Sequence, residues 1–131
     1  MIALDTNVLV RYIVQDDPQQ SAMATALIDA LTPAEPALVP LVVVVELVWV
    51  LESCYGNGKE AVITVLETLL HTRELQVEQA DVIWKAFRLF STQSADFADC
   101  LVAAGVQASG CQHAVTFDRK AARLPGMLLL A

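Results

Sequence analysis

The chain has 131 residues, the size of one domain, and it is long enough to bury a core without disulfides or metal ions. With 56% hydrophobic residues and few charges, the composition excludes a disordered or low-complexity protein. The formal net charge of −7 excludes a broad basic groove for a polyanion. If five acids share one metal site, however, only ten acids remain against eight bases. A partner that carries phosphate groups is therefore not excluded.

Neither export nor membrane insertion is predicted. No basic stretch stands ahead of an apolar run at the N-terminus, as a secretory signal would require. The longest apolar run, residues 37–51, contains Pro40 and Glu46 and falls short of the ~18–20 apolar residues of a membrane span. We expect one soluble domain covering residues 1–131.

The three cysteines are odd in number and form no CxxC pair, so neither a disulfide framework nor a zinc site is predicted. A reducing, cytoplasmic location is the simpler expectation. Because cysteine is often buried, we expect these side chains in the core. They are Cys54, Cys100 and Cys111.

Short apolar runs alternate with longer helical stretches, which indicates an α/β protein with a parallel-rich sheet wrapped by helices. Strands are predicted at residues 2–4, 37–39, 75–77, 113–117 and 127–130. Helices are predicted at residues 7–14, 19–31, 41–54, 59–71, 80–90 and 97–108, with a helical turn at 121–123. Asp16-Asp17-Pro18 separates the first two helices, because proline suits the first turn of a helix.

Residues 41–54 carry two conflicting signals. The four valines at 42–45 favour a strand by propensity. The apolar stretch is long for a strand, however, and no turn signal precedes Gly56-Asn57-Gly58. We predict a helix.

Two acids follow predicted strands. Asp5 follows the first strand and Asp118 a late one, and in open parallel sheets the functional crevice lies at the carboxyl ends of strands. For Asp5 the alternative is a helix cap. Because Thr6 or Asn7 can cap the helix instead, we predict that Asp5 faces the crevice. Asp118 could likewise cap the turn that follows it.

Glu46 stands in the middle of an apolar segment with no basic residue nearby. A carboxylate is almost never buried without a partner, because isolating its charge costs too much free energy. On a helix Glu46 shares a face with Val42 and with Trp49 or Val50, which we predict to point inward. The alternative to a site that holds a cation is a long-range salt bridge.

Asp96 and Asp99 are three residues apart and share one face of a predicted helix. Alternatively, Asp96 is the N-cap and Asp99 is stabilised by the helix dipole. The main basic cluster, Arg119, Lys120 and Arg123, follows Asp118 and suits phosphate binding, unless it is only a solvated turn.

Four or five converging acids repel one another and need cations. Carboxylates without His or Cys suit Mg²⁺ or Mn²⁺, and the natural chemistry is phosphodiester hydrolysis by a metal-activated water. We expect Asp5 and Asp99 to be the main ligands. Glu46 and Asp118 would act directly or through water, and Asp96 from an outer position or on a second metal ion.

The ordered set of these motifs resembles the PIN-domain family, and more closely its VapC-type toxins of type II toxin–antitoxin systems. The matching stretches are residues 4–12 (LDTNVLVRY), 46–51 (ELVWVL), 95–104 (ADFADCLVAA) and 116–121 (TFDRKA). Each stretch alone is weak evidence, but together they occur in the family's order and span nearly the whole chain.

The resemblance implies a three-layer α/β/α fold with a central, mainly parallel sheet. It implies a Mg²⁺- or Mn²⁺-dependent endoribonuclease, a homodimer, and a small VapB-like antitoxin partner. It implies catalytic roles for Asp5, Glu46, Asp99 and Asp118, with Asn7 and Thr116 assisting. We also expect Arg119, Lys120 and Arg11 to bind the substrate. Family members often carry Ser or Thr shortly before the central Glu, which residues 41–45 lack.

Two other functions stay open. A catalytically silent PIN-like module would bind RNA or a protein, although a binder has no need of a costly acidic cluster. A receiver-like signalling domain also places acids at strand ends, but it needs adjacent acids after the first strand. Thr6-Asn7 after Asp5 does not fit that pattern.

Overall fold

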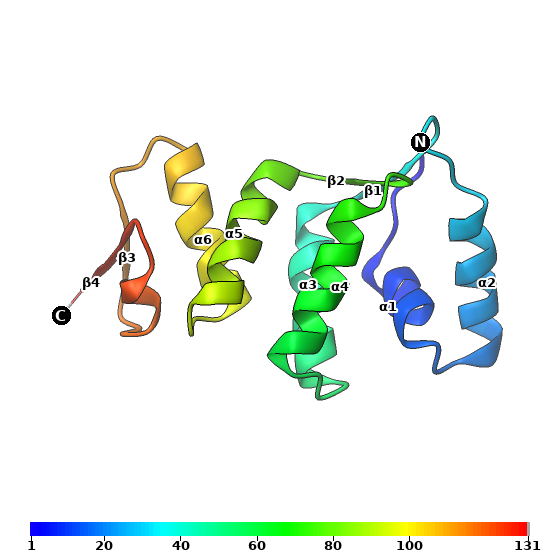
Figure 1. Cartoon of the computed structure of the whole chain (residues 1–131), viewed down its shortest axis with the longest axis horizontal. Coiled ribbons are helices and arrows are strands. Elements are labelled where there is room, and N and C mark those ends of the chain that lie inside the picture. Colours follow the sequence, from blue (N-terminus) through cyan, green and yellow to red (C-terminus); the bar gives the residue numbers. More distant parts are fainter. Residues whose placement is uncertain (131) are drawn as a thin grey trace. The chain divides into compact units, whose positions relative to one another are not determined.

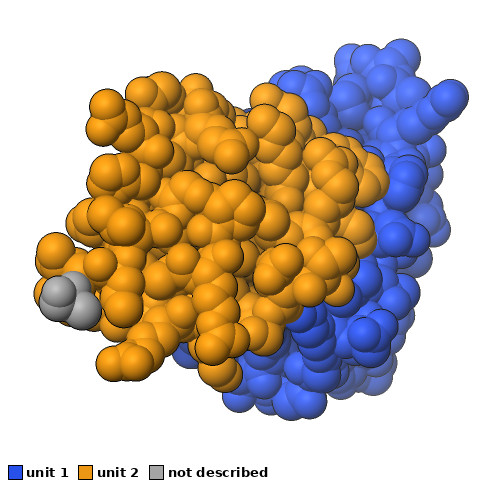
Figure 2. Space-filling view, turned by 60° about the vertical axis from the view of Figure 1, so that its left-hand side comes forward, with its two compact units in different colours: residues 1–78 blue, residues 79–131 orange. Residues whose placement is uncertain are grey.

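The structure, a computed structural model, describes residues 1–130 and combines helices with parallel strands (Figure 1). It forms two units, Met1–Glu78 and Gln79–Ala131 (Figure 2). Each unit contains one pair of parallel strands together with helices, so the predicted α/β class is confirmed. Among residues 1–130, none of the helices combines the length and the apolar composition that a membrane span requires.

Unit 1 is built on the parallel pair β1–β2, in which Ala37 lies opposite Leu75. Its elements are α1 (Thr6–Val14), α2 (Pro18–Asp29), β1 (Ala37–Val39), α3 (Leu41–Ser53), α4 (Lys59–His71) and β2 (Leu75–Val77). The N-terminal segment runs parallel to β1, and the Leu4 amide donates to the Leu38 carbonyl at 2.9 Å. The expected first strand is thus reduced to one bridge, between Ala3 and Leu38.

The helix predicted at residues 41–54 is confirmed as α3. Its buried residues form one face, consisting of Val43, Val44, Leu47, Val48 and Leu51. Burial of this face overrides the strand propensity of the valines. Since α1 contacts both α2 and α3, this packing fixes where α1 begins relative to Glu46 (Figure 1).

Unit 2 is a helical hairpin followed by a second parallel strand pair. Its elements are α5 (Ala80–Thr92), α6 (Phe97–Ala108), β3 (Ala114–Thr116), the 3₁₀ turn η1 (Ala121–Arg123) and β4 (Met127–Leu129). Helices α5 and α6 lie side by side, and the Phe90 and Phe97 rings meet edge to face with centroids 5.7 Å apart. Asp118 follows shortly after β3.

The expectation that all three cysteines are buried is wrong for two of them. Cys100 is buried in α6, where the helix packs against α5. Cys54 and Cys111 are exposed, because each follows the end of a helix, where the chain turns into a loop. All three are free thiols.

The packing of α3 predicts a large stability difference between two positions in the same helix. Leu47 is 0% exposed and Val42 is 70% exposed. We expect Leu47→Ala to lower the free energy of unfolding by about 2–5 kcal/mol because it leaves a cavity. Val42→Ala should change it by no more than about 0.5 kcal/mol. Urea denaturation of both variants measures the difference, and equal losses would contradict the assigned faces of α3.

Candidate functional site

Thr6 organises the acidic end of unit 1. It is the first residue of α1 and only 5% exposed. Its amide donates to Asp5 Oδ1 at 2.8 Å, and its hydroxyl donates to Glu46 Oε1. One buried residue therefore orients two carboxylates that lie forty-one positions apart in the sequence.

Asp5 itself occupies the N-cap of α1, so the expectation that Thr6 or Asn7 would cap this helix is wrong. The cap uses only one carboxylate oxygen. Asp5 is exposed, and its Oδ2 accepts no hydrogen bond from residues 1–130. Asp5 can therefore cap α1 and bind a ligand at the same time, because Oδ1 caps the helix and Oδ2 is left for the ligand.

Glu46 does not point inward as expected. It is exposed on α3 together with Val42 and Trp49, while the opposite face of the helix is buried. The prediction was wrong because α3 leaves some of its apolar side chains exposed, so apolar neighbours in the sequence do not show that Glu46 is buried. Glu46 nevertheless has a defined carboxylate position, since the Thr6 hydroxyl holds Oε1.

Asp5 and Glu46 both line one cavity of about 540 Å³ in unit 1. The other lining residues are Thr6, Asn7, Val10, Arg11, Val50, Cys54 and Tyr55. Asn7 is exposed at this cavity, as an assisting residue must be. The cavity has room for a hydrated cation and a phosphate group beside the two carboxylates.

Arg11, a predicted substrate-binding residue, is held by three neighbours. Its guanidinium donates to Asp16 Oδ1 at 3.1 Å, to Gln20 Oε1 at 2.7 Å and to the Tyr55 hydroxyl at 3.3 Å. The Tyr55 hydroxyl in turn donates to Asp16 Oδ2 at 2.8 Å, which holds the pKa of Asp16 below its ordinary value. This Arg11–Asp16–Tyr55 network ties α1 to the segments after α1 and after α3.

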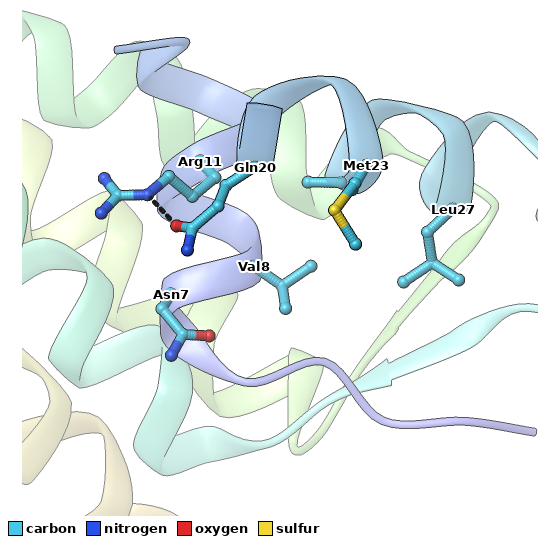
Figure 3. A pocket seen from close by; sticks show the side chains of 7 residues that line it. Asn7, Val8, Arg11, Gln20, Met23 and Leu27 are labelled. Carbon is cyan, nitrogen blue, oxygen red and sulfur yellow. Dashed lines mark hydrogen bonds between the residues drawn. The ribbon is translucent and has the colours of Figure 1, made fainter. Parts of the chain in front are cut away.

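A second cavity, of about 460 Å³, lies between α1 and α2. Figure 3 shows Asn7 and Val8 on α1 beside Met23 and Leu27 on α2, with the Arg11–Gln20 hydrogen bond at one end. Met23 is 67% exposed and Leu27 41%, so this cavity is an open and largely apolar groove.

The other three predicted acids, Asp96, Asp99 and Asp118, belong to unit 2, where the charges of two of them act on the third. Burial raises the pKa of Asp99 above the ordinary carboxyl value, and the charges of Asp96 and Asp118 raise it further. Asp96 is the N-cap of α6, but its side chain makes no capping hydrogen bond. A cation beside Asp99 would relieve this repulsion.

Asp118 is fixed by the turn that follows β3. Its Oδ1 accepts from the amides of Lys120 and Ala121, at 2.8 and 3.1 Å, so the predicted cap of this turn is present. Its own amide donates to Thr116 Oγ1 at 3.0 Å, which gives Thr116 a positioning role. Arg119 and Lys120 are exposed next to this carboxylate.

The donor set fits a hard divalent cation, since the predicted ligands are all carboxylates without His or Cys. Within residues 1–130, no group of three or more His, Cys, Asp or Glu side chains lies close enough together to hold a metal ion. The acids are instead divided between the units. In unit 1, Thr6 joins Asp5 and Glu46, and in unit 2 the charges of Asp96 and Asp118 act on Asp99 without the three forming such a group.

Sequence reasoning missed the roles of Thr6 and Tyr55. For Thr6 a signal existed, because three polar residues in a row exceed what one helix cap needs. For Tyr55 none existed, since its contacts with Arg11 and Asp16 depend on packing between distant segments.

The PIN domain family matches residues 2–127. The chain therefore belongs to the PIN domain family. A VapC ribonuclease from Aquifex aeolicus (strain VF5) is 29% identical over 124 residues, covering 95% of this chain and 92% of that protein. The resemblance predicted from the four motifs is thus confirmed, and the match spans both units.

The role of Thr6 predicts a difference between two small substitutions. Thr6→Val removes the hydroxyl that orients Glu46, whereas Thr6→Ser keeps it. We expect Thr6→Val to lower Mn²⁺ affinity by roughly 10–100-fold, the usual effect of removing an outer partner of a metal ligand. Calorimetric titration with Mn²⁺ measures this change, with Thr6→Ser as the control. If both variants bind Mn²⁺ like the wild type, Thr6 does not position a ligand.

The network around Arg11 predicts a pH-dependent contribution to stability. Because the folded-state pKa of Asp16 is lowered, its charged form stabilises the fold above the ordinary carboxyl pKa of about 3.9. This stabilisation is lost as the pH falls through the lowered pKa. Tyr55→Phe should therefore lower Tm at neutral pH, and its deficit should shrink below about pH 4.

Thermal unfolding across this pH range tests the prediction. Tyr12→Phe is a matched control, because no hydrogen bond joins the Tyr12 hydroxyl to residues 1–130. A deficit for Tyr55→Phe that stays constant with pH would show that the Asp16 charge is not involved.

Proposed function

We propose that this chain is a Mg²⁺- or Mn²⁺-dependent endoribonuclease and the toxin of a type II toxin–antitoxin pair. The observation that supports it most is the orientation of Asp5 and Glu46 by one buried threonine. A merely solvated acidic surface has no need of such an arrangement. Membership of the PIN domain family and the similarity to a VapC ribonuclease support the same activity.

The proposed metal ligands are Asp5 and Asp99, with Glu46 and Asp118 acting directly or through water and Asp96 from an outer position. When bound, the divalent cation supplies an activated water and stabilises negative charge on the phosphate and the leaving oxygen. The raised pKa of Asp99 is consistent with this role, since a carboxylate repelled by its neighbours gains most from a nearby cation.

Other residues orient the carboxylates and the RNA. Thr6 and Thr116 hold Glu46 and the Asp118 backbone through their hydroxyl oxygens. Arg119 and Lys120 are exposed and free to neutralise phosphates near Asp118. Arg11 reaches the rim of the Asp5–Glu46 cavity with a guanidinium already oriented by Asp16, Gln20 and Tyr55.

The proposed partners are structured RNA, a VapB-like antitoxin and a second copy of the chain. The groove between α1 and α2 supports the antitoxin proposal, because it is open, largely apolar and adjacent to Asn7 and Arg11 (Figure 3). A segment seated there would reach the rim of the candidate site. The homodimer is carried over from the family resemblance.

Incubation with total RNA and Mg²⁺ or Mn²⁺ tests the proposed activity. We expect discrete fragments from the wild type, none with EDTA, and cleavage at least about 100-fold slower for Asp5→Asn, the upper range for loss of a partner around a metal. Asparagine caps a helix as well as aspartate, so this variant removes the charge and keeps α1 intact.

Asp29→Asn is the matched control, since Asp29 is exposed at the end of α2 and lines neither cavity near the site. It should cleave like the wild type. If folded wild type free of antitoxin yields the same RNA pattern as the EDTA sample, the chain is a binding module.

A further inference from the structure

The charges of the chain are divided unevenly between the two units. Residues 1–78 hold eleven acids and three bases, a formal charge of −8. Residues 79–131 hold four acids and five bases, a formal charge of +1. Three of those four acids, Asp96, Asp99 and Asp118, belong to the candidate site. Outside that site only Asp81 opposes the five bases, so unit 2 is the part of the chain suited to a polyanion.

Two of these bases line a groove that the candidate site does not use. The groove has a volume of about 400 Å³ and follows the α5–α6 hairpin within unit 2. From α5 it is lined by Lys85, Arg88, Leu89 and Thr92, whose spacing places them on one helix face. From the other side it is lined by Ala103, Ala104, Gln107 and Pro125. No acid lines it.

Lys85 and Arg88 are available to a ligand. Both are exposed, and neither side chain forms an ion pair or hydrogen bond with another described residue. They are three positions apart on α5, which places their Cβ atoms about 5–6 Å from each other. Two neighbouring cations above an apolar floor suit successive phosphates of a nucleic-acid strand with sugars or bases packed beneath.

We infer that the α5–α6 groove is a second RNA-backbone site, in which Lys85 and Arg88 hold substrate phosphates away from the scissile bond. This inference rests on the proposed ribonuclease function. Thr92, at one end of the groove, is the last residue of α5, and Asp96 caps α6 four residues later. The groove and two of the proposed catalytic acids therefore share one hairpin.

The inference implies a preference for RNA long enough to reach both the groove and the catalytic residues. An RNA of a few nucleotides that occupies only the catalytic residues gains nothing from Lys85 and Arg88. A longer structured RNA gains phosphate contacts whose strength falls with salt, because each contact releases condensed counterions. An acidic protein segment could also bind these two cations, and measuring RNA binding as a function of salt distinguishes it from RNA.

RNA binding as a function of salt tests the groove directly. The full chain carries Asp99→Asn to prevent cleavage, and it is compared with and without Lys85→Gln and Arg88→Gln. Loss of two phosphate contacts should make the slope of log K against log salt shallower by roughly 1.4–1.8. Glutamine favours helices about as well as lysine and arginine, so α5 should stay folded.

Lys59→Gln with Arg73→Gln is the charge-matched control, because it removes the same two charges from unit 1. Its slope should equal that of the parent. Equal shifts in both double variants would indicate only general electrostatic attraction and would overturn the inference. An unchanged slope for the groove variant would overturn it as well, and would leave an acidic segment as the occupant to examine.

Cleavage assays separate this inference from the proposed function. With Asp99 restored, the groove variant should have a raised KM for long structured RNA and an unchanged rate on an oligonucleotide of a few nucleotides. If the wild type cleaves both RNAs but the groove variant matches it on each, the groove inference alone fails. If the wild type cleaves neither while the salt slope still shifts, the nuclease proposal fails and the groove remains an RNA site.

Discussion

The structure of the acidic end of unit 1 depends on the two hydrogen bonds that Thr6 donates. Its amide holds Asp5 at the start of α1, and its hydroxyl holds Glu46 on α3. Because Thr6 is buried, its polar groups would be costly to leave without hydrogen-bond partners. The same contact couples the packing of α1 against α3 to the positions of two carboxylates. Thr6, an uncharged residue, therefore contributes both to the packing of α1 against α3 and to the orientation of the two carboxylates.

Acidic residues in this chain serve in two different ways. Asp16 and Asp17 stabilise local structure, the first in the network with Arg11 and Tyr55 and the second by accepting from the Gln20 amide at 2.9 Å. Asp99 instead has a raised pKa, because burial and its acidic neighbours disfavour its charge. Raised carboxyl pKa values of this kind are common at functional sites, and the cation that we propose would favour the charged form of Asp99. The division of charge between the units is a further contrast, since acids outnumber bases in unit 1 and bases outnumber acids in unit 2.

Local patterns in the sequence predicted much of the fold. The helices at residues 59–71 and 97–108 and the strands at 37–39 and 75–77 were predictable because period and turn residues agree there. The acids after strands and at helix starts were recognisable for the same reason. The exposure of Glu46, the exposure of Cys54 and the bond from Thr6 to Glu46 were not predictable. Each depends on which face of α3 packs and where that helix ends, and this is decided by segments far away in the sequence.

We propose that Asp5 and Asp99 bind the same divalent cation, and a double-mutant cycle between Asp5→Asn and Asp99→Asn tests this proposal. Mn²⁺ affinity and RNA cleavage are measured for the wild type, both single variants and the double variant, with folding checked by circular dichroism. If both carboxylates act on one cation, the double variant should be hardly worse than the more damaged single variant, because residues that act as a unit are not additive. Independent effects that multiply in the double variant would contradict the claim and assign the two acids to separate roles.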